Sequence, residues 1–120
     1  HYIHNRKGVC QMKNIDTEKK LQNYLKSECK RRKIKYYKFA SPSKRGVPDV
    51  ILVHSMETYY NMPDRVCFVE LKSPSNKGKL SELQLSEIAE LRDIGASVYV
   101  LDSVEKVNNL MILLTDVEKW

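Results

Sequence analysis

The chain has 120 residues, 42% of them hydrophobic, and a formal net charge of +6. This length suits one domain with a single core, and no apolar run approaches the length of a transmembrane helix, so we expect no membrane association. The three cysteines lack CxxC spacing, which argues against a disulfide framework or a zinc site. Free thiols and the absence of a signal-peptide pattern predict a reducing compartment.

The first half of the chain predicts a helix and a strand. Residues 1–11 have no clear periodicity and precede Met12, so we interpret them as a leader outside a domain that spans 12–120. Leu21, Tyr24, Leu25 and Cys29 recur at helical spacing behind a cap at Asp16 or Thr17, which predicts a helix over residues 18–32. Residues 34–41 alternate and predict a strand, and residues 42–46 predict a turn.

Positive charge is concentrated in this same half. Residues 1–50 contain 14 Lys and Arg against 4 Asp and Glu, whereas residues 51–120 contain 7 against 11. A one-sided basic field suits a phosphate backbone. Cations that complement a helix C-terminus are the alternative for part of the run. The predicted nucleic-acid contacts are Lys30, Arg31, Arg32, Lys33, Lys44 and Arg45.

The rest of the chain predicts three more strands and two more helices. Strands are expected over residues 49–54, 66–72 and 98–101, and helices over 81–93 and 104–113. Leu83, Ile88, Leu91 and Ile94 are expected to face inward from the first of these helices, and Gly95 to end it. The order αβββαβα predicts a single α/β domain whose mixed central sheet is flanked by helices.

Two predicted strands contain ionised side chains where a buried strand should have none. Asp49 opens one strand, and Glu70 and Lys72 close the next. An unpaired buried carboxylate is costly, and residues two apart on a strand share a face. If the strands pair, two carboxylates and a lysine meet at one edge of the sheet. The alternative is a turn at Asp49 and a solvated pair on an edge strand.

This combination suits phosphodiester hydrolysis with a divalent metal. Mg²⁺ or Mn²⁺ prefers hard oxygen ligands and keeps several waters, so the expected ligands are Asp49, Glu70 and the backbone carbonyl of Leu71. Such a metal lowers the pKa of bound water and polarises the phosphate. Lys72 would orient the nucleophile and offset developing charge.

Pro48-Asp49 followed by Glu70-Leu71-Lys72 resembles the signature of the PD-(D/E)XK nucleases. Gly46–Asp49, Phe68–Lys72, Leu80–Gln84 and Leu91–Ala96 resemble the small VRR-NUC branch of that superfamily, over most of the chain. The resemblance implies a restriction-endonuclease-like domain that cleaves branched, Holliday-junction-like DNA with a metal. It also implies a free-standing phage or bacterial protein that acts as a homodimer.

Two auxiliary residues follow from position and resemblance. Glu18 lies about 20° from Leu25 and Cys29 on a helical wheel, so we expect it on the buried stripe. A first-turn glutamate that complements the helix dipole is the alternative. The resemblance implies that Glu18 reaches the metal, directly or through water, and that Gln84 supports the site; a surface glutamine is the alternative for Gln84.

Loop and surface residues complete the expectations. Ser73, Lys77 and Lys79 are interpreted as contacts to the DNA backbone near the site, although a flexible polar loop has the same composition. Tyr36, Tyr37, Tyr59 and Tyr60 would stack on unpaired bases or pack in a sheet or dimer interface. The dimer is expected to use Leu110–Leu114 or Tyr59-Tyr60, unless Leu110–Leu114 covers the sheet of its own chain.

Three function classes remain open. We favour a Mg²⁺- or Mn²⁺-dependent endonuclease on branched DNA, acting in the cytoplasm of a bacterial host or phage-infected cell. The second class has the same chemistry but a sequence-specific, RNA or DNA-end target. The third, a non-catalytic DNA-binding module, is disfavoured because a binder gains nothing by placing carboxylates near phosphates.

Overall fold

The computed structural model describes residues 2–4, 10–12, 14–55, 65–75 and 79–115. Seven elements follow the predicted order αβββαβα: α1 (Glu18–Arg31), β3 (Lys35–Lys38), β4 (Val50–Val53), β5 (Val66–Leu71), α2 (Glu82–Asp93), β6 (Val98–Leu101) and α3 (Val104–Thr115). The predicted single α/β domain is therefore confirmed. Within the described residues, none of the helices has the length and apolar character that crossing a membrane requires.

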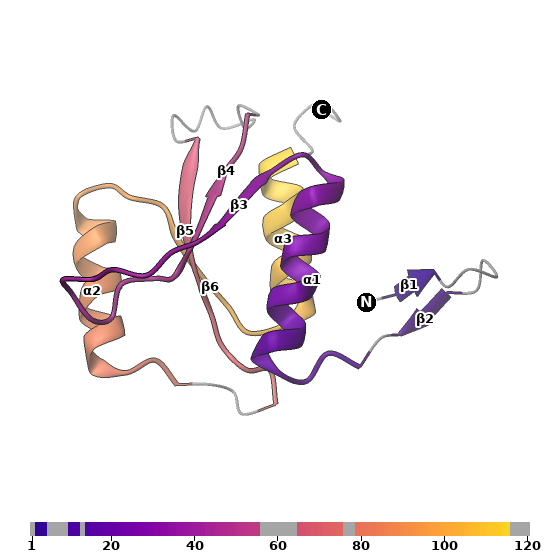
Figure 1. Ribbon diagram of the computed structural model, residues 1–120, viewed down its shortest axis with the longest axis horizontal. Helices are drawn as coiled ribbons and strands as arrows, with labels where there is room; N and C mark the ends of the chain where they lie inside the picture. The colour runs from indigo at the N-terminus through magenta and orange to yellow at the C-terminus, as the bar shows by residue number, and fades with distance from the viewer. Residues whose placement is uncertain (1, 5–9, 13, 56–64, 76–78, 116–120) are drawn as a thin grey trace.

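A separate pair of strands precedes these elements. β1 (Tyr2–His4) pairs antiparallel with β2 (Cys10–Met12). Figure 1 shows this pair standing apart from the main sheet, beyond α1. All of these residues except Met12 fall in the segment 1–11 that we interpreted as a leader, and the domain boundary at residue 12 stays a prediction.

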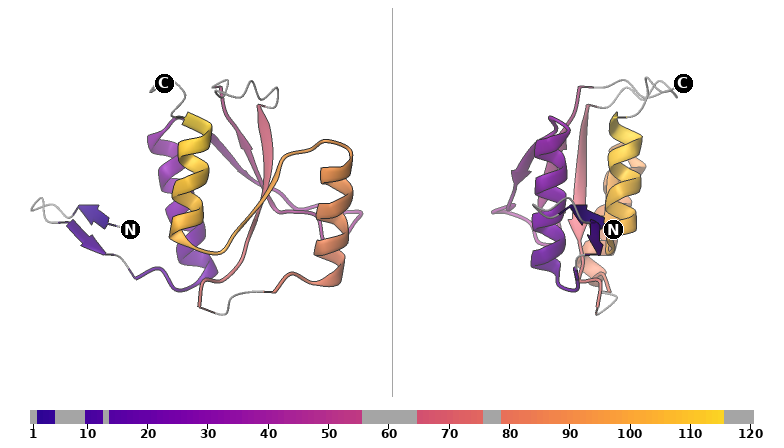
Figure 2. Two further views of the ribbon diagram at one scale, coloured as in Figure 1. Left: turned by 180° about the vertical axis from the view of Figure 1, so that it is seen from behind. Right: turned by 90° about the vertical axis from the view of Figure 1, so that its right-hand side faces the viewer.

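The main sheet is mixed and has the strand order β3-β4-β5-β6. β4 pairs antiparallel with both β3 and β5, whereas β5 and β6 are parallel and α2 connects them. Figures 1 and 2 show three layers, with α1 and α3 side by side on one face of the sheet and α2 on the other. Two helices therefore cover one face of the sheet, and one helix covers the other.

The core lies between the sheet and the two helices α1 and α3. Leu21, Leu25 and Cys29 of α1 are all 0% exposed, at the spacing that the sequence predicted. Burying a side chain of this size contributes roughly 1.5–3 kcal/mol relative to leaving it in water. The facing residues alternate along the strands or recur at helical spacing along α3: Val50, Leu52, Cys67, Val69, Leu71, Leu101, Val107, Leu110, Met111 and Leu114.

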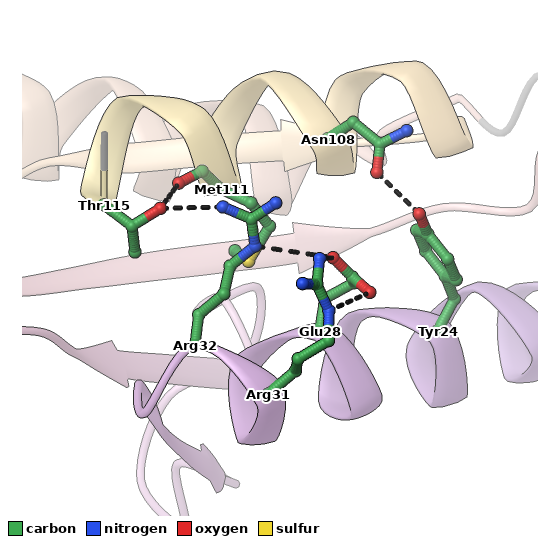
Figure 3. Close-up of polar contacts among 7 residues, drawn as sticks. All are labelled: Tyr24, Glu28, Arg31, Arg32, Asn108, Met111 and Thr115. Carbon is green, nitrogen blue, oxygen red and sulfur yellow. Dashed lines mark hydrogen bonds and ion pairs between the residues drawn. The ribbon is translucent and has the colours of Figure 1, made fainter. Parts of the chain in front are cut away.

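Polar contacts join α1 to α3 at the rim of this core (Figure 3). The Tyr24 hydroxyl donates to Asn108 Oδ1 at 2.6 Å, and Arg32 Nη1 donates to Thr115 Oγ1 at 2.8 Å. Glu28 accepts hydrogen bonds from Arg31 and Arg32 on its own helix. These contacts give the two helices a defined alignment that apolar packing alone does not specify.

The prediction for α2 was partly wrong. Leu83 and Ile94, which we expected to face inward, are 51% and 82% exposed, and Ile88 is the buried residue of the helix. α2 packs chiefly against β6 at one side of the sheet, so only a narrow stripe of the helix finds apolar surface. Ile94 is the C-cap residue and lies past the end of that stripe.

Candidate active site

The sheet register brings Asp49 and Glu70 together. Val50 pairs with Val69 in antiparallel β4 and β5, so one step further along the ladder Asp49 stands opposite Glu70. Directly opposite residues in an antiparallel pair have Cβ atoms about 4.5–5.5 Å apart, and like charges at that distance destabilise the sheet. Two carboxylates from different strands therefore meet where β4 begins and β5 ends, as the two strand patterns predicted.

Glu70 is the buried member of this pair. It is 6% exposed and lies on the face opposite the core residues Val69 and Leu71. Burial first, and then the charge of Asp49, raise the pKa of the Glu70 carboxyl to about 7, while the Lys72 ammonium opposes the shift. Glu70 is thus an acid whose charge this chain only partly compensates.

Gln84 holds Glu70 from the N-terminus of α2. Its Nε2 donates to Glu70 Oε2 at 3.0 Å, and its Oε1 accepts from the backbone N–H of Ser81 at 2.9 Å. The Ser81 hydroxyl accepts in return from the Gln84 N–H, which completes a capping box. The first turn of α2 therefore fixes the amide of Gln84 on the carboxylate.

Lys72 and Leu71 complete the end of β5. The Lys72 N–H donates to the Leu101 carbonyl at 2.9 Å, which extends the pairing with β6 by one residue. Lys72 is two residues after Glu70, so its side chain leaves the strand on the same face, and its charge acts on Glu70. Leu71 is 2% exposed and anchors the strand between them in the core.

Lys38 is a neighbour of the site that the sequence analysis did not assign to it. Its Nζ lies 2.9 Å from Asp49 Oδ2, and this contact raises the pKa of Lys38. Lys38 ends β3, the strand next to β4, and the sheet order supplies the proximity. In sequence it appeared as one more cation of the basic field, so its specific role required the pairing of the strands.

A hollow of ≈ 470 Å³ adjoins Asp49. It is lined by Lys38, Phe39, Ala40, Ser41, Lys44, Arg45, Gly46, Val47 and Asp49. Gly46 has φ +87°, and a Cβ there would lie 2.7 Å from the backbone carbonyl carbon and oxygen of Leu83. Lys44 Nζ lies 3.1 Å from Glu87 Oε1 of α2. The loop that lines the hollow is thus seated directly on the first turns of α2.

Glu18 does not lie on the buried stripe, so that prediction was wrong. Its side chain is exposed, because α1 begins at Glu18 and the first buried residue is Leu21, almost one turn later. The helical wheel gave its direction correctly but not the point at which the core ends. The charge of Glu18 still contributes to the raised pKa of Glu70, which places it near the site.

The donor set suits a hard divalent cation. Among the described residues, no group of three or more His, Cys, Asp and Glu side chains could hold a metal ion, so Glu18 does not join Asp49 and Glu70 in one cluster. Mg²⁺ usually takes one or two carboxylates and completes its octahedron with waters and phosphate oxygens. Two crowded carboxylates, one of them buried and only partly compensated, fit that requirement.

Comparisons with known proteins assign this chain to a family. The VRR-NUC domain family matches residues 1–105. This chain belongs to that family. It is 37% identical over 87 residues to the protein named "Putative nuclease p44" of Acyrthosiphon pisum secondary endosymbiont phage 1, a match that covers 72% of this chain and 83% of that protein. A solved structure of a VRR-NUC domain matches with a TM-score of 0.64 at 27% identity, over 78% of this chain and 92% of the other.

The VRR-NUC resemblance is therefore confirmed, and it identifies the protein as a nuclease. The Asp49 and Glu70-Leu71-Lys72 positions lie inside the matched region, as does the Gln84 that holds Glu70. Their catalytic and metal-binding roles stay predictions.

The basic residues of the VRR-NUC domain divide into two groups. Arg31 and Arg32 are turned onto Glu28, and Arg32 also reaches Thr115 of α3 (Figure 3). Lys30 and Lys33 instead line a groove beside β3, and Arg45 lines the hollow at Asp49. The contiguous run from Lys30 to Lys33 is thus not one contact surface.

The residues after β5 that were predicted to contact DNA are only partly described. Ser73 Oγ is 3.3 Å from Ser75 Oγ, one residue past Lys72, and Lys79 is exposed just before α2. Lys77, Tyr59 and Tyr60 lie outside the described residues. Tyr36 is partly buried against the core and Tyr37 is 50% exposed.

Proposed function

We propose that this protein is a Mg²⁺- or Mn²⁺-dependent endonuclease that hydrolyses phosphodiester bonds in branched DNA. The observation that supports the proposal most is the cross-strand position of Asp49 opposite Glu70, with Glu70 only 6% exposed. Like charges opposite each other weaken a sheet, so this arrangement works against stability. It is useful where a cation and a phosphate are to be bound.

Each residue at the site has a role in that reaction. A bound metal would lower the pKa of a water molecule and polarise the scissile phosphate. Asp49 and Glu70 would hold the metal, the Leu71 carbonyl would supply a third oxygen, and Gln84 keeps the Glu70 carboxylate oriented. Lys72 would orient the attacking water and offset the negative charge that develops on the phosphate.

DNA shape, rather than base sequence, is the proposed basis of target choice. The basic side chains around the site are lysines and an arginine of the hollow and the neighbouring groove. Phosphate contacts of this kind position a protein on nucleic acid but do not read its sequence directly. A branch point offers a distinctive phosphate geometry without requiring base contacts.

A homodimer would match a four-way junction. The junction has near-twofold symmetry and requires two incisions, whereas one chain supplies one Asp49–Glu70–Lys72 site. Of the predicted interface Leu110–Leu114, three residues belong to the core of their own chain, while Ile112 and Leu113 are 51% and 36% exposed. These two residues are the part of α3 that would contact a partner.

The deciding experiment compares cleavage of a four-way junction, a flap, a linear duplex and single-stranded RNA, each with Mg²⁺, with Mn²⁺ and with EDTA. We expect metal-dependent cuts in the junction or the flap, and Ca²⁺ should support binding with little cutting because it tolerates irregular coordination. Undiminished cleavage in EDTA would remove the metal mechanism. Cleavage of RNA alone, or equal cleavage of linear duplex, would move the protein to another substrate class.

Light scattering tests the dimer separately. A dimer should give about twice the chain mass of 14.0 kDa, and Ile112→Asp should reduce that value if α3 forms the interface. Paired junction cuts by a strictly monomeric protein would contradict this arrangement.

A further inference from the structure

A wide groove lies beside the edge strand β3. It measures ≈ 680 Å³ and is lined by Asn23, Lys26, Ser27, Lys30, Lys33, Ile34, Lys35, Tyr36 and Tyr37. One wall is the outer side of α1, and the other is β3 with the turn that precedes it. Four lysines and no acid form its described lining, so the groove has a strongly positive potential.

The four lysines differ from six other cations of the described residues, which have carboxylate partners. Lys20, Arg31, Arg32, Lys38, Lys44 and Lys106 each lie within 4.0 Å of a carboxylate. Within the described residues, no such ion pair forms at Lys26, Lys30, Lys33 or Lys35. Unpaired cations gathered in one concave surface are suited to a polyanion.

Two tyrosines of the groove contact two of its lysines. Lys26 Nζ lies 5.9 Å from the centre of the Tyr36 ring, and Lys35 Nζ lies 5.9 Å from the centre of the Tyr37 ring. At this distance each ammonium group makes a cation–π contact with one face of its ring, and the contact presents the lysine at the surface. The rings therefore support the lysines of the groove.

The groove continues the hollow at Asp49 along one strand. Tyr37 is the last residue that lines the groove, and Lys38, the next residue, lines the hollow and pairs with Asp49. The backbone of β3 therefore runs from the groove to the hollow.

We propose that the groove between α1 and β3 binds the sugar–phosphate backbone of the duplex arm that flanks the cut. This inference rests on the proposed function for the existence of a scissile bond. The occupant is a nucleic-acid backbone held by point charges, and the contact contributes affinity and salt dependence without reading bases.

A charge-matched pair of variants tests the groove through binding alone. Lys30→Gln with Lys35→Gln removes one cation from each wall, whereas Lys20→Gln with Lys106→Gln removes two exposed cations elsewhere. Binding to a junction is measured in EDTA over a range of salt concentrations. The slope of log Kd against log[salt] should become shallower by about 2 in the groove variant and stay near the wild-type slope in the control.

The DNA offers a reciprocal test. Single methylphosphonate groups, which remove one phosphate charge, are placed at successive positions on either side of the cut. The slope of the wild type should fall most at one set of positions on the flanking arm, beside the cut. At those positions the methylphosphonate should not reduce the slope of the groove variant any further. A flat scan, equal slopes in the groove and control variants, or no DNA binding would overturn the proposal. Groove-dependent binding without any Mg²⁺-dependent cleavage would instead sink the proposed function and leave the groove in place.

Discussion

Charge of opposite sign gathers at the two ends of β3. Beyond Lys38, Asp49 and the 6%-exposed Glu70 crowd two carboxylates together. At the other end, the groove between α1 and β3 gathers four lysines without an acid among its described lining. Charged side chains are normally exposed, or else paired when buried. The proposed cation would neutralise the first region, and the proposed polyanion would neutralise the second.

The sharpest way to separate the two regions is to remove charge from the carboxylate region without changing its shape. Asp49→Asn, Glu70→Gln and Lys72→Met should each lower the single-turnover rate on a branched substrate by about 100-fold or more, with the fold retained. Circular dichroism checks the fold. DNA binding by Asp49→Asn should be equal to wild type or tighter, because a negative charge near the phosphate is gone. Wild-type rates in any one variant would remove that residue from the site.

A pair of glycines tests how the hollow is held against α2. Gly46 and Gly95 have φ of +87° and +99°, so an alanine at either position costs about 1–2 kcal/mol in backbone conformation. At Gly46 the new Cβ would also meet the Leu83 backbone at 2.7 Å, whereas at Gly95 nothing lies within 4 Å. Gly46→Ala should therefore reduce both thermal stability and cleavage, and Gly95→Ala stability alone. Equal cleavage by the two variants would show that the seating of the loop on α2 is unimportant.

The buried carboxylate also predicts a stability that depends on pH. The pKa of Glu70 is raised from its ordinary 4.5 to about 7, so the folded protein favours the protonated acid and loses stability as pH rises through this window. In EDTA, Glu70→Gln should raise the melting temperature at pH 8 and have little effect below pH 4.5. Added Mg²⁺ should stabilise the wild type and not the variant. The same melting shift at both pH values would contradict this account.

Strand patterns in the sequence predicted that Asp49, Glu70 and Lys72 lie together, because side chains alternate between the two faces of every strand. Asp49, Glu70 and Lys72 stand at the ends of apolar runs, and the alternation of a strand is enough to place Glu70 and Lys72 on one face. Antiparallel pairing then brings Asp49 opposite Glu70. Nothing beyond the pairing of two neighbouring strands was needed for this part.

The wrong predictions have a common cause: each depends on the surroundings of a residue in the folded chain, which a local sequence pattern does not contain. Glu18 has the direction of the buried stripe but lies beyond the end of the core, and Ile94 lies past the end of α2. The run Lys30–Lys33 appeared uniform, yet Arg31 and Arg32 are drawn to Glu28 and Arg32 to Thr115 of α3 (Figure 3). A local pattern does not contain such tertiary partners.

The smallest expected effect concerns Lys38, which connects the two regions. Its Nζ lies 2.9 Å from Asp49 Oδ2, where it provides the positive charge that a metal would otherwise supply. Both side chains are partly exposed, at 51% and 37%, so the pair contributes no more than about 1 kcal/mol. Lys38→Gln should therefore lower the Mg²⁺ concentration for half-maximal thermal stabilisation by up to about fivefold, since ammonium and metal compete for one carboxylate. Lys20→Gln, which removes an ion pair of similar exposure at Asp16, is the control and should leave that concentration unchanged. A higher Mg²⁺ requirement in Lys38→Gln would mean that Lys38 assists metal binding, and Asp49 would then need both cations at once.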